Sequence, residues 1–261
     1  IEVDAARDNG TSGALLDRLA LDEDRIEAMA SGIDAIANSP DPVGRELASW
    51  VVPSGLHIRR VAIPLGVIAI IYEARPNVTA DAAALCFFSG NAVILRGGSE
   101  CVKTNRAIAH CLQHALDDEQ LPRAAIQMIE NQAHAEVDVL LQQHELIDVL
   151  IPRGGENLIR RVTEHSRIPV FSHLQGLCHT YIHHAADLSM AVDVVLNAKM
   201  RRVGICGATE SLVIDKTATP HLLPLIVDDL TASGCEVRGD AIARKVDQRI
   251  VPASDEDWGA E

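Results

Sequence analysis

The stretch GVIAIIYEARPNVTADAAALCFFSGNAVILR, residues 66–96, decides the fold class. It opens with a continuous apolar and largely β-branched run, residues 66–72, which is typical of a strand buried on both faces of a parallel sheet. Residues 79–88 follow with the pattern of a helix, for which Thr79 is a candidate N-cap. Residues 91–96 then repeat the strand pattern. A strand, a helix and a strand in this order predict a parallel βαβ unit.

The same alternation continues on the C-terminal side of this unit. We expect helices and strands by turns at residues 101–116, 125–129, 133–143, 146–152 and 154–165. A shorter series follows, with strands at 178–184 and 209–214 and helices at 188–199 and 221–234. On the N-terminal side, spaced apolar residues over 11–38 predict amphipathic helices, and residues 50–63 predict a hairpin around a Pro-Ser-Gly turn. The sequence therefore predicts an α/β fold with a Rossmann-like parallel sheet that is covered by helices on both faces.

The composition argues against several classes of protein. Hydrophobic residues make up 48% of the 261 residues, so the chain can bury a core. The formal net charge of −14 argues against a nucleic-acid backbone or an anionic membrane as the main partner. No apolar run approaches the ~20 residues of a membrane span, and the N-terminus lacks the layout of a signal peptide. The six cysteines have irregular spacings without a C-x-x-C motif, as expected of reduced thiols in a cytoplasmic protein.

One cysteine has an unusual setting. In MRRVGICGATESLVI, residues 200–214, Cys206 lies between two glycines in a loop that joins an expected helix to an expected strand. A thiolate is a good nucleophile for an acyl or aldehyde carbon, and flanking glycines leave room for an incoming carbonyl group. Lys199 and Arg201 are close in sequence and could hold an anionic substrate. The alternative is a buried structural thiol beside glycines that serve only turns.

Asn77 is the second candidate for a chemical role. It lies in IYEARPNVTADAA, residues 71–83, just after an expected buried strand. Functional groups of α/β sheets gather at such strand ends, and an amide NH₂ there could donate to a developing oxyanion. Alternatively, Asn77 only caps the helix or turns the chain.

Two Arg-Gly-Gly turns, in LRGGSE (95–100) and IPRGGENL (151–158), follow expected strands and precede expected helices. Backbone N–H groups, a guanidinium and a hydroxyl at such turns suit a phosphate group. The residues that would contact it are Arg96, Gly97, Gly98 and Ser99 in the first turn and Arg153, Gly154 and Gly155 in the second. Neither turn matches G-x-G-x-x-G, so two tight turns without a ligand remain the alternative.

The segment SHLQGLCHTYIHH, residues 172–184, is rich in side chains that can bind metal ions. These are His173, Cys178, His179, His183 and His184. Their spacing fits no standard zinc pattern, and the alternation of a strand sends neighbouring residues to opposite faces. We therefore expect no metal site.

Taken in order, these motifs resemble the gamma-glutamyl phosphate reductases of the aldehyde dehydrogenase superfamily. The stretches that carry the resemblance span the chain: DRLALDEDRI, DPVG, PLGVIAIIYEARPNVTADAAALC, SGNAVILRGGSE, IPRGGENLI, VLNAK and ICGATESLVI. The resemblance implies an NADP-binding domain over residues 1–180, with an oligomerisation hairpin at about 47–63. It also implies the N-terminal part of a second α/β domain, the catalytic domain, over residues 181–261, in a chain truncated relative to the family.

The resemblance further implies a reaction and a role for each candidate residue. The reaction is the NADPH-dependent reduction of L-glutamate 5-phosphate to L-glutamate 5-semialdehyde and phosphate, the second step of proline biosynthesis. Cys206 would be the nucleophile that forms a thioester, and Asn77 an oxyanion donor. Arg96 and Ser99 would contact the adenosine ribose and its 2′-phosphate, the second Arg-Gly-Gly turn would form the second cofactor loop, and Glu261 would hold the nicotinamide ribose. The hairpin implies a homo-oligomer, and the family leaves open a fusion to, or an association with, glutamate 5-kinase.

The chain departs from the family pattern around the nucleophile loop. Many family members have Gln-Arg-Pro before this loop and Asn after the cysteine, where this chain has residues 201–203 as Arg-Arg-Val and Gly207.

Two rival functions stay open. A hydrolytic aldehyde dehydrogenase would use the same thiol but needs a general base. Residues 173–179, HLQGLCH, contain no carboxylate where such enzymes place a glutamate, which favours reduction. The other rival is a non-catalytic fragment that only binds nucleotide or partner subunits.

Overall fold

The computed structural model describes residues 2–8, 16, 19–73, 75–172, 176–203 and 205–259. The chain divides into two compact units, Ile1–Leu174 and Gln175–Glu261. This division keeps the strand at Cys178–Ile182 whole within the second unit, whereas a boundary at residue 180 would cut it. Within the described ranges, every helix is too short or too polar to span a lipid bilayer.

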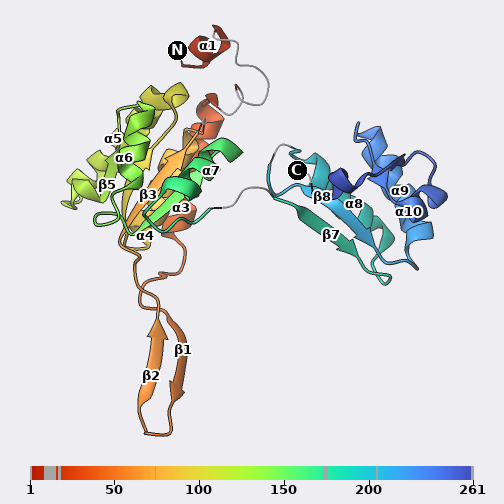
Figure 1. Ribbon diagram of the computed structural model, residues 1–261, viewed down its shortest axis with the longest axis horizontal. Helices are drawn as coiled ribbons and strands as arrows, with labels where there is room; N and C mark the ends of the chain where they lie inside the picture. The colour runs from red at the N-terminus through yellow and green to blue at the C-terminus, as the bar shows by residue number, and fades with distance from the viewer. Residues whose placement is uncertain are drawn as a thin grey trace. The chain divides into compact units, whose positions relative to one another are not determined.

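A four-stranded parallel sheet forms the centre of the first unit (Figure 1). Its strands are β3 (Val67–Tyr72), β4 (Ala92–Arg96), β5 (Ile126–Met128) and β6 (Val149–Arg153). They lie in the order β5-β4-β3-β6, so the chain builds outward from β3 to β5 and then returns to place β6 on the other side of β3. The predicted Rossmann-like sheet is confirmed. Its strand order reverses between β3 and β6, and such a switch point leaves a crevice at the carboxyl ends of the strands.

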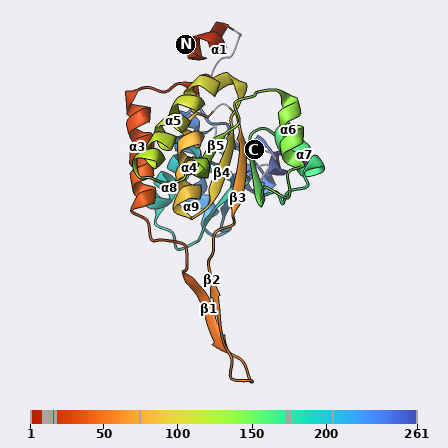
Figure 2. The ribbon, with the colours of Figure 1, turned by 90° about the vertical axis from the view of Figure 1, so that its left-hand side faces the viewer.

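Alternate residues of β3 pack against different helices. The helices are α4 (Asn77–Phe88), α5 (Val102–Asp118), α6 (His134–Leu141) and α7 (Glu156–His165). Ile68, Ile70 and Tyr72 share a core cluster with α4 and α5, and Ala69 and Ile71 share another with α6 and α7. Figure 2 shows these two pairs of helices on opposite sides of β3. Because helices cover both faces, the strand needs apolar residues at every position, which explains its continuous apolar run.

The start of α4 differs from the prediction. The helix begins at Asn77, directly after Pro76, so Thr79 lies inside the first turn and is not its N-cap. A proline at a helix start has its φ angle already set and lacks a backbone N–H that would need a partner. Thr79 is fully buried and uses its hydroxyl for contacts with other elements. A short 3-10 turn, η1 (Ser99–Cys101), also precedes α5.

Helices and a hairpin precede the sheet. The helices are α1 (Glu2–Asp8) and α3 (Glu23–Ala37), and the hairpin strands are β1 (Glu46–Val51) and β2 (His57–Val61). The hairpin is confirmed: its strands pair antiparallel, with Trp50 opposite Ile58, and Gly55 in the turn has a φ of +86° that favours glycine. Of the segment predicted as helical over 11–38, residues 11–15, 17 and 18 lie outside the described residues.

The second unit is built on a smaller parallel pair of strands, β7 (Cys178–Ile182) and β8 (Thr209–Ile214). Its other elements are α8 (Leu188–Met200), α9 (Thr219–Ala232), β9 (Arg238–Gly239), α10 (Ala241–Val246), β10 (Val251–Pro252) and η3 (Asp255–Gly259). Buried residues of β7, α8 and α9, among them Ile182, Val195 and Ile226, form its core. The sequence predicted β7, α8, β8 and α9 but not the short elements after residue 234.

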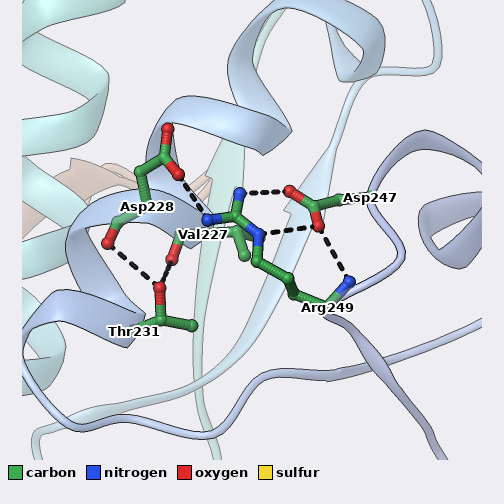
Figure 3. A network of polar contacts seen from close by, with 5 residues as sticks. All are labelled: Val227, Asp228, Thr231, Asp247 and Arg249. Atoms are coloured by element: carbon green, nitrogen blue, oxygen red, sulfur yellow. Dashed lines mark hydrogen bonds and ion pairs between the residues drawn. The ribbon is translucent and has the colours of Figure 1, made fainter.

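An arginine holds the end of α10 to α9 (Figure 3). Arg249 pairs with Asp228 of α9 and, at 2.5 Å, with the largely buried carboxylate of Asp247 just after α10. Asp247 also accepts the backbone N–H of Arg249 at 2.9 Å. Hydrogen bonds from Arg249 hold the pKa of Asp247 below its usual value. The last segment of the unit is thus fixed by a charged network as well as by its small apolar core.

Candidate active site

The loops that follow β3, β4 and β6 meet at the switch point of the sheet. Neighbouring strand residues pair Ile71 with Arg96 and Tyr72 with Arg153, so the loops after these residues start side by side. Both predicted Arg-Gly-Gly turns therefore lie at the carboxyl edge of one sheet, which is where α/β proteins bind ligands.

A chain of buried polar groups supports the first turn. The Tyr72 hydroxyl lies 2.6 Å from Thr79 Oγ1, and Thr79 donates to Asn105 Oδ1 at 3.1 Å. The Asn105 amide then donates to Cys101 Sγ at 3.3 Å, and this thiol is 3.9 Å from the Gly98 carbonyl. Burial raises the pKa of Tyr72 to about 12 and that of Cys101 to about 11, so both stay neutral near pH 7. The chain links β3, α4 and α5 to the turn by uncharged hydrogen bonds.

Gly97 is required by this network. A Cβ atom at position 97 would lie 2.0 Å from Asn105 Nδ2 and 3.1 Å from a Tyr72 ring carbon. A side chain would therefore displace the buried amide, so the turn passes directly over the network. The sequence predicted the turn but gave no sign of the buried groups beneath it.

Arg96 is buried at the end of β4 with part of its guanidinium unpaired. Its Nη2 donates to the Gln132 carbonyl at 3.2 Å, whereas its Nε and the Gln132 Oε1 are buried without a hydrogen-bond partner. Burial lowers the pKa of Arg96, and the nearby carboxylates of Glu100 and Glu73 oppose that shift. An arginine keeps its charge in a protein, and buried polar groups are usually paired. This site therefore fits an added acceptor such as a phosphate or a sugar hydroxyl, and the exposed Ser99 follows three residues later in the same turn.

Glu73 organises the second turn. Its carboxylate accepts the backbone N–H of Gly155, the N-cap residue of α7, at 2.9 Å. A Cβ atom at Gly154 would lie 2.6 Å from the Glu73 carboxyl carbon. Arg153 is exposed at the end of β6. Glu73 is not among the site residues predicted from the sequence, although its place directly after a buried strand could have indicated it.

Asn77 is exposed on the first turn of α4, in the loop region that follows β3. Its amide donates to Asp81 Oδ2 at 3.0 Å, one helical turn further on. The structure thus places the predicted oxyanion donor at the carboxyl edge of the sheet, and it also shows a local partner that the sequence did not indicate.

Cys206 lies in the loop between α8 and β8 and is exposed. Gly207 has open space around it, since a Cβ there would meet no atom closer than 4.0 Å. The Cys206 carbonyl oxygen packs against residues at and just before β7. Cys178 Sγ lies 3.2 Å from that oxygen, and a Cβ atom at Gly176 would lie 2.0 Å from it. The thiol is therefore accessible while its backbone is packed against the start of β7.

The two predicted substrate-binding cations differ. Lys199 donates to Glu210 Oε2 at 2.7 Å in a half-buried ion pair, so its charge is already matched within the unit. Arg201 is exposed at the C-terminal end of α8. Glu210 is the extra residue of a β-bulge, because Cys178 and His179 pair with Thr209 and Ser211 and leave it unpaired. No local pattern in the sequence indicates this bulge.

The predicted residues divide between the two units. Asn77, Arg96 and Arg153 belong to the first, and Cys206, Lys199 and Arg201 to the second. Glu261 lies outside the described residues. In the described parts of the chain, His, Cys, Asp and Glu side chains form no group of three or more that could hold a metal ion.

Comparison with known proteins fixes the family. The model of the aldehyde dehydrogenase family matches residues 22–247. The chain belongs to the aldehyde dehydrogenase family. Among curated members, it is 55% identical over its whole length to the gamma-glutamyl phosphate reductase of Paramagnetospirillum magneticum, of which it covers 62%. It is 53% identical over 97% of its length to that of Hyphomonas neptunium, of which it covers 59%.

Solved structures of aldehyde dehydrogenase family members agree. The gamma-glutamyl phosphate reductase of Thermotoga maritima superposes on the whole chain with a TM-score of 0.88 at 39% identity, and the chain covers 63% of it. That of Saccharomyces cerevisiae matches 94% of the chain with a TM-score of 0.61 at 32% identity, with 61% of its own length covered. The resemblance to gamma-glutamyl phosphate reductases is confirmed. The chain spans about three fifths of the length of the relatives it matches.

Proposed function

We propose that the protein containing this chain reduces L-glutamate 5-phosphate to L-glutamate 5-semialdehyde, with NADPH as reductant and release of phosphate. The observation that carries the proposal is the exposed thiol of Cys206 beside an open Gly207, in a chain whose relatives at 51–55% identity are named gamma-glutamyl phosphate reductase. The substrate is an acyl phosphate, which is an activated carbonyl compound. A thiolate is the protein nucleophile best suited to it near neutral pH.

In the first step, the Cys206 thiolate attacks the acyl carbon, a C–S bond forms, and the C–O bond to phosphate breaks. When bound, NADPH supplies a hydride to the resulting thioester carbon. The tetrahedral intermediates carry a negative oxygen, toward which the backbone N–H of Cys206 and the amide of Asn77 would donate. Collapse of the second intermediate releases the aldehyde and returns the thiolate. The Asn77 amide has two N–H donors, so one can donate to the substrate while the other donates to Asp81.

The residues at the switch point fit an anionic nucleotide. The buried, partly unpaired guanidinium of Arg96 would contact the adenosine ribose or its 2′-phosphate, with the Ser99 hydroxyl beside it. Backbone groups of both Arg-Gly-Gly turns would approach the cofactor at the carboxyl edge of the sheet. An arginine at the ribose site favours NADPH over NADH, because only NADPH carries the extra phosphate charge. Glu261 is proposed to hold the nicotinamide ribose on the strength of the resemblance alone.

For the anionic substrate, Arg201 is a better candidate than Lys199. Arg201 is exposed next to the nucleophile loop, whereas Lys199 is engaged with Glu210 at 2.7 Å. The net charge of −14 makes such a local cation necessary, since the field of the whole chain repels phosphate.

The hairpin supports a homo-oligomer. Its strands expose several large apolar side chains, namely Leu47, Trp50, Val51, Ile58 and Val61. A two-stranded ribbon is marginally stable alone in water, so contact with a second copy of the chain would cover this surface.

We further propose a cytoplasmic location and association with glutamate 5-kinase, whose acyl phosphate product would pass to this protein.

The reaction is tested in reverse on the full-length protein. Purified enzyme is mixed with the semialdehyde and NADP⁺, and NADPH formation is followed with and without inorganic phosphate. Strict dependence on phosphate is expected, because phosphate must cleave the thioester. Turnover without phosphate would overturn the proposal in favour of the hydrolytic aldehyde dehydrogenase. Tight NADPH binding together with a Cys206 that iodoacetamide does not label would favour the non-catalytic alternative, in which the chain only binds nucleotide or partner subunits.

A further inference from the structure

Cys178 is placed against the backbone of the candidate nucleophile. Its Sγ lies 3.2 Å from the carbonyl oxygen of Cys206. A carbonyl oxygen is about 2.4 Å from its own Cα given standard bond lengths, so the Cys178 sulfur is within about 5.6 Å of the Cys206 Cα. The two residues come from different elements, β7 and the loop before β8, within the same compact unit.

Other features of the second unit keep the two cysteines together. Gly176 packs so closely on Cys206 that a Cβ there would lie 2.9 Å from the Cys206 Cβ. The β-bulge at Glu210 lies between the register positions of Cys178 and His179, and bulges re-aim the side chains beside them. Cys178 is half-buried and Cys206 is exposed, so a small oxidant can reach the Cys206 thiol before it reaches Cys178.

We infer that Cys178 is a resolving thiol, which forms a reversible disulfide with Cys206 when a peroxide oxidises the latter. In the first step the Cys206 thiolate attacks hydrogen peroxide: an S–O bond forms, the O–O bond breaks, and hydroxide leaves. The Cys206 sulfur is oxidised to the sulfenic acid and the peroxide is reduced to water. In the second step the Cys178 thiolate attacks that sulfur: the S–S bond forms, the S–O bond breaks, and hydroxide leaves and takes up the proton lost by the Cys178 thiol, which gives a second water.

The consequence is protection of Cys206. A sulfenic acid without a resolving thiol is oxidised further to the sulfinic acid, which a dithiol does not reduce. A disulfide is returned to two thiols by a dithiol, which supplies two electrons and two protons. The effect on turnover rests on the proposed function, whereas the disulfide itself requires only an accessible Cys206.

Three other cysteines provide internal controls. Burial raises the pKa of Cys86 and that of Cys101 to about 11, which keeps both as unreactive thiols. Cys111 is exposed on α5, in the first unit, and reports on non-specific oxidation.

Peptide mapping tests the inference on the full-length protein. The protein is treated with hydrogen peroxide, alkylated, and digested with trypsin without reduction. Trypsin separates the two cysteines into residues 168–199 and 203–216, so the disulfide appears as a linked pair with the summed mass less two hydrogen atoms. We expect this pair to accumulate, and dithiothreitol to restore both free peptides and NADPH-forming activity.

Two variants complete the test. Cys178→Ser keeps a hydroxyl that can donate to the Cys206 carbonyl, so the loop contact is retained. In that variant peroxide should convert Cys206 to the sulfinic acid, with a loss of activity that dithiothreitol does not reverse; Cys111→Ser should behave as the wild type. A wild-type Cys206 found as sulfinic acid, or linked to any other cysteine, would overturn the inference. If the linked pair forms but the enzyme shows no phosphate-dependent turnover, the proposed function fails and the disulfide stands.

Discussion

The carboxylate of Glu73, just after β3, accepts a 2.9 Å hydrogen bond from the backbone N–H of Gly155 at the start of α7. These residues are 82 positions apart and meet because β3 and β6 are neighbours in the sheet. The bond satisfies one of the free N–H groups at a helix start, and a negative charge there is favoured by the helix dipole. One side chain thus ties together two of the loops that meet at the switch point.

We expect Gly154→Ala and Glu73→Ala to have the same effect. The new Cβ at position 154 would lie 2.6 Å from the Glu73 carboxyl carbon, which would move this flexible side chain off Gly155, and 2.8 Å from Leu158 Cδ2. Each variant should lower the free energy of unfolding by about 0.5–2 kcal/mol, the cost of losing a helix cap. Chemical denaturation measures this, with Gly155→Ala as the matched control because its Cβ would lie an ordinary 3.8 Å from Glu73. The double variant should cost less than the sum of the two single losses, because only the contact with Leu158 is added once Glu73 is removed; additive losses would show that the two residues act separately.

Loss of the Thr79 hydroxyl should lower the free energy of unfolding by more than loss of the Tyr72 hydroxyl. Thr79→Val leaves the buried Tyr72 hydroxyl and Asn105 oxygen without partners, which should cost about 1–3 kcal/mol. Tyr72→Phe removes a terminal member of the chain and should cost about 0.5–1.5 kcal/mol. In a double-mutant cycle read by denaturation, the double variant should lose less than the sum, because one unpaired group has been removed. Simple additivity would contradict the hydrogen-bond chain.

Asn77 and Asp81 can be separated by kinetics. If Asn77 donates to the oxyanion, Asn77→Ala should lower kcat of the full-length enzyme by about 10²–10³-fold. Asp81→Ala removes the same local hydrogen bond but frees the Asn77 amide, so kcat should be retained. Equal losses in both variants would assign Asn77 a local structural role.

Cys206→Ala should abolish thioester formation, seen as loss of acylated protein by mass spectrometry.

Arg96 should determine cofactor affinity. Arg96→Met removes a buried cation with an unpaired Nε, and loss of a charge-assisted hydrogen bond to the 2′-phosphate should raise the NADPH dissociation constant about 10- to 100-fold. The increase should be smaller for NADH, which lacks that phosphate. Titration of both cofactors by fluorescence provides the comparison. Arg106→Met, an exposed arginine of α5 paired with Glu130 at 2.9 Å, is the matched control and should leave both affinities unchanged.

The acid stability of the second unit should depend on Asp247. Hydrogen bonds from Arg249 lower its pKa in the folded state. Its stabilising contribution is therefore present above the unfolded-state pKa of about 3.9 and is lost as the pH falls through the lower folded value. Asp247→Asn should destabilise the protein at pH 7, and the difference from the wild type in denaturation midpoint should shrink below about pH 4. A difference that stays constant down to pH 2 would exclude the charged pair as its source.

The sequence by itself determined the elements of the sheet. The run at 66–72, the strands that follow it and the intervening helices are legible because each is set by local periodicity and by burial on both faces. The same local logic marked both Arg-Gly-Gly turns and picked out Cys206, since glycine on either side of a loop thiol is a local feature. Thr79 was misplaced as a cap because its use depends on Tyr72 and Asn105, which no local pattern reveals.

Only the tertiary structure decided which of these residues support one another. Glu73 holds Gly155, Arg96 reaches Gln132, and Cys178 contacts Cys206 across separations of 82, 36 and 28 residues. Lys199 is likewise matched by Glu210 through a bulge that no motif indicates. The physical reason is strand order: local patterns fix where a strand lies in the sequence, but the neighbours of its carboxyl end depend on how the whole sheet is connected.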